Sequence, residues 1–355
     1  MGPLPPPPGG MANQCEQLAR LLPCDMVSVQ VARTNAPYRP AWAGRMPIFR
    51  ALVRLLPYLW KLWRSAGQAD VVHVLANSGW AWHLFAAPAV WIARLRDVPV
   101  IVNYRGGEAE AFMRKAPRHV PATLRMARAI VAPSPFLQRV FHDLGFAPVT
   151  VPNFVDLDRF APGAPRDFGD APHLVVTRNL EAIYDIATAV RAFAKVRESY
   201  PNARLSIAGI GPERAPLEAL AIELGIDDAV ALLGRIDGSR MPALYASADC
   251  MLNPSRVDNM PNAILEAFAS GVPVVSTDAG GIPDMAEDGR SALLVSVADA
   301  EAMARQAVRV LSDRALAASL RTHGLQAVAR YSWPVVRDCW LQLYLDVTAD
   351  RGAAA

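Results

Sequence analysis

The sequence predicts an α/β protein made of two doubly wound, Rossmann-like domains, and three observations support this prediction. Short runs rich in β-branched residues alternate with longer stretches of helical periodicity, which is typical of βαβ units and a parallel sheet. A segment rich in proline, glycine and aspartate, residues 153–173, interrupts this alternation and is interpreted as the interdomain linker. The chain has 355 residues, 52% of them hydrophobic, which is enough material for two cores.

The strands are expected where the β-rich runs lie. In the first domain these are residues 26–32, 71–75, 98–104, 129–133 and 148–152. In the second domain they are residues 173–177, 203–209, 229–234, 248–254, 272–277 and 291–296. We place the first domain at residues 1–165, the second at 166–330 and a closing helix at 331–355. Because Trp340, Leu341 and Tyr344 recur at helical spacing, that helix is predicted to pack back on the first domain.

The start of the chain departs from the usual order of a βαβ unit. A glycine-rich loop normally follows a strand and opens a helix, and here Gly9 and Gly10 of PPPPGG precede the helical stretch MANQCEQLARLL. No strand precedes these glycines in the sequence. The first domain is therefore predicted to lack its first strand, and a start site upstream of Met1 is our preferred explanation.

Composition excludes several classes of function. Thirty-six Lys and Arg against 33 Asp and Glu give a net charge of only +3, which is too little for a general nucleic-acid binder. The four cysteines have no CxxC spacing and no two histidines stand four apart, so neither a disulfide framework nor a metal site is predicted. The longest apolar run, residues 84–93, is about half of the roughly 20 residues that a spanning helix requires. A cytoplasmic protein without metal or cofactor is expected.

The stretch RVDNMPNAILEAFASGVPVVSTDAGGIPD, residues 256–284, carries the densest functional pattern. It places two carboxylates, Asp258 and Glu266, on either side of the turn that opens a predicted helix. After the next strand, Gly280 and Gly281 provide a turn that allows close approach of the backbone to a ligand. Since ligands of open α/β sheets bind at the carboxyl ends of the strands, a site is predicted at that edge of the second sheet.

The start of this predicted helix indicates the chemistry of the ligand. Pro261 suits a first helical turn because its φ is fixed and its missing N–H would be unpaired there. The backbone amides near Asn262 and Ala263 then suit a phosphate oxygen. Glu266 lies little more than a turn further on, where its carboxylate can accept two hydrogen bonds from the diol of a ribose. Together these features predict a nucleotide diphosphate with a sugar attached, and Asp258 lies beside that sugar.

The same residues resemble the signature of the retaining GT-B glycosyltransferases of family four. That signature is a glutamate, seven residues, a second glutamate and then EAxAxGxPVVxTxxGG, and the corresponding text here is Asp258, seven residues and EAFASGVPVVSTDAGG, which begins at Glu266. Further counterparts cover nearly the whole chain: PPPPGG, ADVVHVL, APSPFL, VPNFVDLDRF, LSIAGIGPER, VALLGRI and YSW. The resemblance implies a GT-B fold, in which two Rossmann-like domains face a central cleft.

The resemblance also implies a role for each matching residue. Glu266 would bind the ribose, Asp258 the donor sugar, and Arg178 the diphosphate, which makes these three the candidate catalytic residues. The backbone around Gly234 would hold the base. The expected donor-binding residues are Asn262, Ala263, Gly234, Arg235, Ile236, Arg256, Gly280 and Gly281. The expected acceptor-side residues are Gly9, Gly10 and Arg105.

Several positions depart from the family pattern. Asp258 replaces a glutamate and is one methylene shorter, and Tyr184 stands where the family has a lysine six residues after the arginine. Arg256 or Arg105 is our hypothesis for the cation that compensates for this lysine. Arg105 precedes two glycines where many members have a histidine, and Phe154 replaces the glycine of the usual PNGVD.

A basic amphipathic helix is predicted at residues 45–64, which contain no acidic residue. Its cations fall on one side and its large apolar side chains on the other, the former being Arg50, Arg54, Lys61 and Arg64 and the latter Leu52, Leu55, Leu56, Leu59, Leu62 and Trp63. Such a helix fits an anionic membrane surface, with Tyr58 and Trp60 in the headgroup layer. It equally fits a helix packed against the first sheet, and the two interpretations are compatible.

We therefore predict a retaining, metal-independent glycosyltransferase that moves a sugar from a nucleotide-diphosphate donor to an acceptor hydroxyl. The expected acceptor is a saccharide or lipid-linked saccharide of bacterial exopolysaccharide or lipopolysaccharide synthesis, and the expected location is cytoplasmic, with peripheral contact to the inner face of the membrane. Two alternatives stay open. One is a catalytically impaired protein that binds sugar nucleotides, and the other is a nucleotide-sugar epimerase of the same fold.

Overall fold

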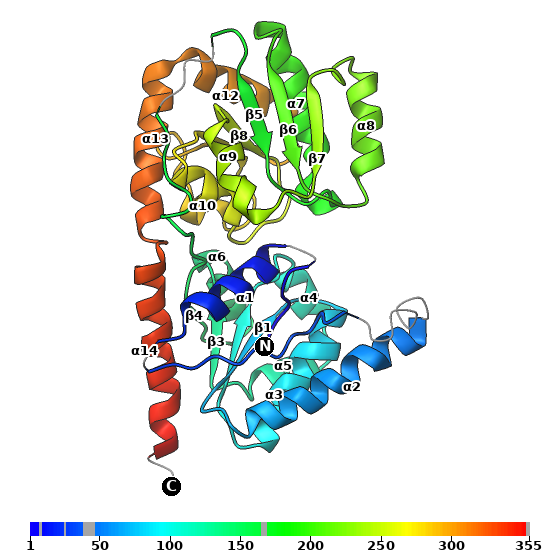
Figure 1. Ribbon diagram of the computed structural model, residues 1–355, viewed down its shortest axis with the longest axis vertical. Coiled ribbons are helices and arrows are strands. Elements are labelled where there is room, and N and C mark those ends of the chain that lie inside the picture. The colour runs from blue at the N-terminus through cyan, green and yellow to red at the C-terminus, as the bar shows by residue number, and fades with distance from the viewer. Residues whose placement is uncertain (7–8, 25, 38–46, 165–168, 353–355) are drawn as a thin grey trace. The chain divides into compact units, whose positions relative to one another are not determined.

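The computed structural model describes residues 1–6, 9–24, 26–37, 47–164 and 169–352. The chain forms two compact units, each built on a parallel sheet with helices around it (Figure 1). Unit 1 consists of Met1–Asn153 and Val336–Ala355, and unit 2 of Phe154–Val335. The first border, between Asn153 and Phe154, lies inside the predicted linker. Phe154 belongs to unit 2, where its ring packs on that of Trp333 with centroids 4.6 Å apart. The α/β class with two Rossmann-like sheets is confirmed.

Unit 1 contains a four-stranded parallel sheet whose strands lie side by side in chain order. They are β1 (Val72–Ala76), β2 (Val100–Tyr104), β3 (Ala129–Ala132) and β4 (Val149–Thr150), all within predicted runs or one residue beyond them. The helices are α1 (Gly10–Leu21), α2 (Pro47–Ala66), η2 (Trp82–Ala86), α3 (Ala87–Leu95), α4 (Ala109–Lys115), α5 (His119–Leu124), α6 (Pro135–Asp143) and α14 (Trp333–Gly352). Their core forms around the fully buried side chains of Trp82, Tyr104 and Phe141.

The predicted strand at residues 26–32 is wrong. In the described part of this region only isolated bridges occur, from Cys24 to Val27 and from Gly2 to Arg33. The backbone of residues 1–2 lies between β1 and this segment, since Leu75 N donates to the Met1 oxygen and Gly2 N to the Ala32 oxygen. Residues 1–2 are too short to form a ladder of hydrogen bonds with residues 26–32. A segment of alternating apolar and polar residues forms a strand only when a partner strand lies beside it. Among the described residues, no strand precedes α1, as predicted from the start of the sequence, and none lies between α1 and β1, where the run at residues 26–32 had predicted one.

Helix α14 reaches unit 1 from the end of the chain. Its residues from Val336 onward belong to that unit. The Tyr344 hydroxyl lies 2.8 Å from Nδ1 of His73, and the ring of buried Trp340 lies 4.6 Å from the same imidazole. These contacts explain the apolar spacing in the closing segment, because Trp340, Leu343 and Val347 form one buried face.

Helix α2 confirms the predicted amphipathic helix and contains Pro57 in its interior. Tyr58, Leu62 and Ala66 are buried against the unit 1 core, and the Tyr58 hydroxyl donates to the Phe85 carbonyl oxygen at 2.9 Å. Among the residues of the predicted helix, Arg45 and the side chains of Arg50 and Leu52 lie outside the part of the chain that the structure describes.

Unit 2 contains a six-stranded parallel sheet of order β10-β9-β8-β5-β6-β7. The strands are β5 (His173–Val176), β6 (Arg204–Ala208), β7 (Val230–Gly234), β8 (Cys250–Asn253), β9 (Val274–Thr277) and β10 (Leu293–Val295), and each lies inside a predicted run. The helices are η3 (Ala182–Tyr184), α7 (Ile186–Ser199), α8 (Arg214–Glu223), η4 (Gly238–Arg240), α9 (Met241–Ala246), α10 (Asn262–Ala269), α11 (Ile282–Met285), α12 (Ala300–Ser312) and α13 (Arg314–Ala329).

Both faces of the unit 2 sheet are buried. Leu174 and Val176 of β5 join one apolar cluster, whereas Val175 between them joins the other. This alternation follows from the two-residue period of a strand. The order of the sheet reverses at β5, because the chain proceeds from β5 to β6 on one side and later returns to β8 on the other. The carboxyl ends of β5 and β8 therefore flank a topological switch point, where open sheets of this kind bind ligands.

Candidate functional site

The three candidate catalytic residues of unit 2 lie at this switch point. Arg178 follows β5 by two residues, Asp258 lies in the loop after β8, and Glu266 is in α10, which that loop enters. Neighbouring parallel strands end at the same edge, so residues 80 or more positions apart in sequence come together there. The clearest sign is an ion pair between the Arg178 Nη2 and the Asp258 carboxylate, whose side chains are each only 11% exposed.

Arg178 is held from two sides. Asp258 binds one end of the guanidinium, and the ring of Tyr184 lies 4.0 Å from its central carbon in a cation–π contact. The Nε of Arg178 is buried and has no hydrogen-bond partner among the described residues. A buried donor without a partner is costly, so this N–H is available to an anionic ligand.

Asp258 is buried and tied into its loop. Its carboxylate accepts from the backbone N of Asn259 at 3.0 Å, and its carbonyl oxygen accepts from Gly281 N at 3.0 Å. Burial raises the pKa of the Asp258 carboxyl, while Arg178 opposes the rise. The second hydrogen bond connects the loop after β8 to the glycine turn after β9, so Gly281 is fixed beside Asp258.

The start of α10 lies in the same loop. The helix begins at Asn262, as predicted, but Pro261 is the residue just before its first turn and adopts an extended conformation, with φ −68° and ψ 119°. No side chain caps this start. A helix start without a capping side chain presents partial positive charge and backbone donors to its surroundings. Gly280, with φ +57°, supplies the left-handed turn after β9 that a side chain would disfavour.

Glu266 lies one turn into α10, and its partner is a residue that the sequence did not reveal. The Tyr245 hydroxyl, from helix α9, lies 3.1 Å from Glu266 Oε2, 3.2 Å from the Ala263 carbonyl oxygen and 2.6 Å from Thr177 Oγ1. Tyr245 is fully buried. Burial raises the pKa of Glu266 to about 7, with Tyr245 and nearby arginines opposing that rise. Neither Tyr245 nor Thr177 belongs to a motif, and no sequence signal identified them.

The predicted base-binding residues follow β7. Gly234 ends that strand with φ +67°, and its carbonyl oxygen accepts from Gly209 N at 2.9 Å. Arg235 is exposed and Ile236 is half-buried. These residues lie at the carboxyl edge of the same sheet, two strands from β5 in the order of the sheet.

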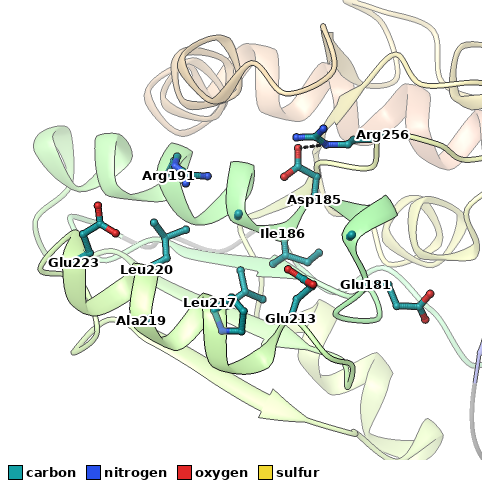
Figure 2. A pocket seen from close by; sticks show the side chains of 13 residues that line it. Glu181, Asp185, Ile186, Arg191, Glu213, Leu217, Ala219, Leu220, Glu223 and Arg256 are labelled. Atoms are coloured by element: carbon teal, nitrogen blue, oxygen red, sulfur yellow. Dashed lines mark hydrogen bonds and ion pairs between the residues drawn. The ribbon is translucent and has the colours of Figure 1, made fainter.

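Arg256, the proposed substitute for the missing lysine, forms a different contact. Its Nε lies 2.9 Å from Asp185 Oδ2, and the side chain is 54% exposed. Figure 2 shows this pair at one end of a pocket of about 500 Å³ between α7 and α8, with Glu181, Glu213 and Glu223 around it. This pocket contains none of Arg178, Asp258 and Glu266, and its carboxylates would repel a diphosphate.

The acceptor-side candidates lie in unit 1. Gly9 precedes α1 in an extended conformation, with open space around its Cα, and Gly10 begins that helix. Arg105, after β2, donates to the side-chain oxygens of Asn103 and Asn153. Burial lowers the pKa of Arg105 to about 10. Arg105 is thus held within unit 1, at the carboxyl edge of its sheet.

The residues that the structure describes contain no group of three or more His, Cys, Asp and Glu side chains that could hold a metal ion. Within the same residues, no helix has the length and apolar character needed to cross a bilayer.

Comparison with known proteins agrees with this arrangement. The family described as Glycosyltransferase Family 4 matches residues 8–159, and the family described as Glycosyl transferases group 1 matches residues 171–313. The chain is a group 1 glycosyltransferase of family 4. Structural similarity supports the GT-B fold of this family: HepE from Anabaena, solved with UDP and glucose, superposes with a TM-score of 0.69 at 20% identity, over 84% of this chain and 83% of that one.

Among relatives of this glycosyltransferase, an exopolysaccharide phosphotransferase of Streptomyces coelicolor is 32% identical over 53% of this chain and 20% of its own length. The lipopolysaccharide core biosynthesis glycosyltransferase LpsE of Rhizobium meliloti is 29% identical over 71% of this chain and 74% of its own length. The chain spans about half the length of several further curated relatives. These relatives differ in substrate, so the reaction of this glycosyltransferase has to be argued from its own site.

Proposed function

We propose that this glycosyltransferase transfers a sugar from a nucleotide-diphosphate donor, bound at the carboxyl edge of the unit 2 sheet, to an acceptor hydroxyl. The observation that carries the proposal is the grouping of Arg178, Asp258, Glu266 and the uncapped start of α10 at one topological switch point. A guanidinium and a helix N-terminus both favour anionic groups, whereas a carboxylate one turn away favours hydroxyls.

Each group then has a chemical task. Arg178, through its unpartnered Nε, and the amides near Asn262 and Ala263 neutralise the diphosphate as negative charge develops on it. Glu266 accepts hydrogen bonds from the ribose, and Asp258 contacts the donor sugar. Residues 234–236 hold the base, and the turn at residues 280–281 lets the backbone approach the donor. These cations and amides stabilise the leaving group without a metal ion.

The transfer retains the anomeric configuration in this proposal. The departing phosphate accepts the proton of the acceptor hydroxyl on the same face of the sugar, so no separate carboxylate base is needed. Arg178 favours this path because it stabilises the phosphate while the sugar–oxygen bond breaks. A hexose is the proposed sugar, and the bound UDP and glucose of the HepE structure support a nucleotide hexose as donor class.

The acceptor is proposed to be a saccharide or a lipid-linked saccharide, presented by unit 1 near Gly9, Gly10 and Arg105. The LpsE and exopolysaccharide relatives support a role in lipopolysaccharide or exopolysaccharide synthesis.

Helix α2 is proposed to rest on an anionic membrane surface. Leu56 and Trp60 are 62% and 65% exposed, and Trp63 is also exposed, which is unusual for three large apolar side chains on one helix. Lys61 and Arg64 lie among them and are exposed. Exposed indoles with interspersed cations fit the headgroup layer of a bilayer with anionic lipids. The proposed location is therefore the cytoplasmic face of a membrane.

The proposed function is tested by incubating the full chain with a panel of labelled nucleotide hexoses, with and without membrane extract as a source of acceptor. We expect release of the nucleoside diphosphate and labelling of an extracted saccharide with one donor of the panel. Glu266→Ala is expected to weaken donor binding, and an affinity equal to that of the wild type would contradict the ribose role. The anomeric configuration of the product, measured by NMR, tests retention.

An impaired sugar-nucleotide binder is a second candidate because Tyr184 replaces a cation of the family and Arg178 is already paired with Asp258. This alternative predicts donor binding with neither transfer nor hydrolysis in the same panel. An epimerase of the same fold would convert the sugar of the donor without any acceptor, and chromatography of the recovered nucleotide sugar detects that outcome.

A further inference from the structure

Unit 1 carries an aromatic cluster that the proposed roles leave unused. It consists of Trp80, His83, Phe112 and His119, and we name it the indole–imidazole cluster. Trp80 is 78% exposed, the most exposed of the large hydrophobic side chains in the described part of the chain. Its ring meets that of His83 edge-on, with centroids 6.2 Å apart, and His83 also meets Phe112 at 6.0 Å. Apolar side chains that lie together at the surface mark binding sites more often than scattered ones do.

The cluster is rigidly supported from beneath. Ser78 Oγ and the Tyr104 hydroxyl are 2.7 Å apart, and Trp82 N donates to the Gly79 oxygen at 3.0 Å. Trp82 itself is fully buried. Gly79 has φ +69°, which turns the chain so that Trp80 leaves the body of the unit. The backbone that carries Trp80 is therefore held by the core, which reduces the cost of ordering it around a ligand.

Two features of the backbone place this cluster at a position of functional interest. Trp80 begins the helical turn that leads into η2, shortly after β1, and therefore lies at the carboxyl edge of the unit 1 sheet, as does Arg105 after β2. His83 lies in the π-helix η2, Trp82–Ala86, and π-helical turns are frequently found at functional sites.

The polar part of the cluster is a pair of imidazoles. His83 Nδ1 and His119 Nε2 lie 3.3 Å apart, and the ring centroids are 5.3 Å apart. In this pair each ring directs one nitrogen at the other and keeps its second nitrogen, which can donate or accept a hydrogen bond. A flat apolar ring beside imidazole nitrogens that can form hydrogen bonds complements a pyranose, which has an apolar C–H face and a rim of hydroxyls.

We propose that the indole–imidazole cluster binds a saccharide, with a pyranose ring stacked on Trp80 and its hydroxyls bonded by His83 and His119. This proposal rests on the proposed function in one respect, namely that the saccharide bound there is part of the acceptor. The binding itself does not depend on catalysis. The cluster contains no lysine or arginine, which supports recognition of the hydroxyl-bearing sugar over a phosphate.

The test uses the full chain labelled with ¹⁵N at the indole nitrogens and titrated with methyl glycosides of common hexoses and N-acetylhexosamines. The Trp80 signal, assigned by its loss in Trp80→Phe, is expected to shift saturably with at least one glycoside while the other indoles stay in place. Trp80→Ala is expected to weaken that affinity about tenfold, and Trp80→Phe less, because a ring remains. His119→Ala should weaken it as well.

No shift of the Trp80 signal with any glycoside, or the same shift at every indole, overturns the proposal. A response to inorganic phosphate alone also overturns it. Failure of the proposed function has a different signature, since it leaves glycoside binding intact and removes turnover of the donor. Conversely, a transferase whose Trp80→Ala variant keeps the wild-type KM for its acceptor supports the proposed function and contradicts the acceptor role of the cluster.

Discussion

The carboxyl edges of the two sheets carry different kinds of side chain. In unit 2 the edge holds two polar pairs. One is the ion pair of Arg178 with Asp258, whose side chains are each 11% exposed, and the other is the contact of half-buried Glu266 with fully buried Tyr245. In unit 1 the edge carries exposed aromatic rings, with Arg105 buried and bonded to two asparagines. Fixed charges away from water suit a charged ligand such as a diphosphate, whereas exposed rings suit a neutral polyol. This contrast supports the proposal that unit 2 holds the donor and unit 1 the acceptor.

The largest effect is expected when the ion pair at the carboxyl edge of the unit 2 sheet is broken. Arg178→Met leaves the Asp258 carboxylate buried without its cation, which we expect to lower the free energy of unfolding by about 3 kcal/mol. Loss of the same cation should reduce transfer by about two orders of magnitude. Urea unfolding and donor turnover measure the two effects.

The double variant Arg178→Met with Asp258→Asn is the matched control. It removes the uncompensated charge, so we expect it to recover most of the stability but none of the activity. If Arg178→Met is as stable as the wild type, the ion pair contributes nothing and the edge is not the charged site described above.

The second prediction concerns the titration of Glu266. The folded protein holds the proton of Glu266 up to about pH 7, whereas the ordinary pKa is 4.5. The wild type should therefore lose stability as the pH rises from about 4.5 to about 7 and level off above that range. Glu266→Gln should lack this part of the slope, which is at most about 1.4 kcal/mol per pH unit for one proton.

The difference between the two unfolding curves isolates Glu266, because Asp258 titrates in both proteins. Parallel curves across this pH range would contradict the raised pKa. The same titration has a functional consequence, since the ionised carboxylate is the better acceptor for ribose hydroxyls. Donor binding by the wild type should strengthen as the pH approaches about 7, and Glu266→Gln should not follow.

The site at the carboxyl edge of the unit 2 sheet was largely predictable because the residues that indicate it are close together in the sequence. Pro261 and the glycine after α10 delimit that helix in the sequence itself, and the predicted runs fix where β5 and β8 end. Once parallel strands are assumed, the carboxyl edge follows without further information. Asp258 and Glu266 were predicted from this reasoning, whereas Arg178 was assigned by the resemblance to the glycosyltransferase family, and the roles of all three stay predictions.

Other features could not be predicted because tertiary packing decides them. Tyr245 lies in α9, 21 residues before Glu266, and reaches it only because both helices pack on one face of the sheet. Residues 26–32 alternate like a strand, but alternation does not reveal whether a neighbouring strand exists. The partner of Arg256 was likewise hidden, since Asp185 adopts a left-handed conformation, φ 44°, just before α7.

The next prediction concerns Tyr245, whose hydroxyl is expected to contribute about 1 kcal/mol to the free energy of donor binding. Tyr245→Phe keeps the ring in the core but removes the hydroxyl that contacts Glu266 and Thr177. We expect the donor KM to rise roughly fivefold with little change in kcat, because a ground-state contact to the ribose is loosened. Discrimination between the ribose nucleotide and its 2′-deoxy analogue should shrink in the same variant.

This combination separates a positioning role from a merely structural one. A structural defect would lower the melting temperature and kcat without changing the preference for ribose. Unchanged discrimination between the two nucleotides would therefore contradict the positioning of Glu266 by Tyr245, even if the KM rises.

The smallest expected effect concerns the exposed side of unit 1. Lys61→Gln removes one cation from α2 without touching the buried face formed by Tyr58 and Leu62. Each basic residue near an anionic surface contributes about 1 kcal/mol, so binding to phosphatidylserine-containing vesicles should weaken roughly fivefold in a sedimentation assay at low salt. Lys195→Gln, on α7 of unit 2, changes the net charge equally and should leave binding unchanged. Equal losses in both variants would mean that overall charge, and not α2, attracts the protein to the surface.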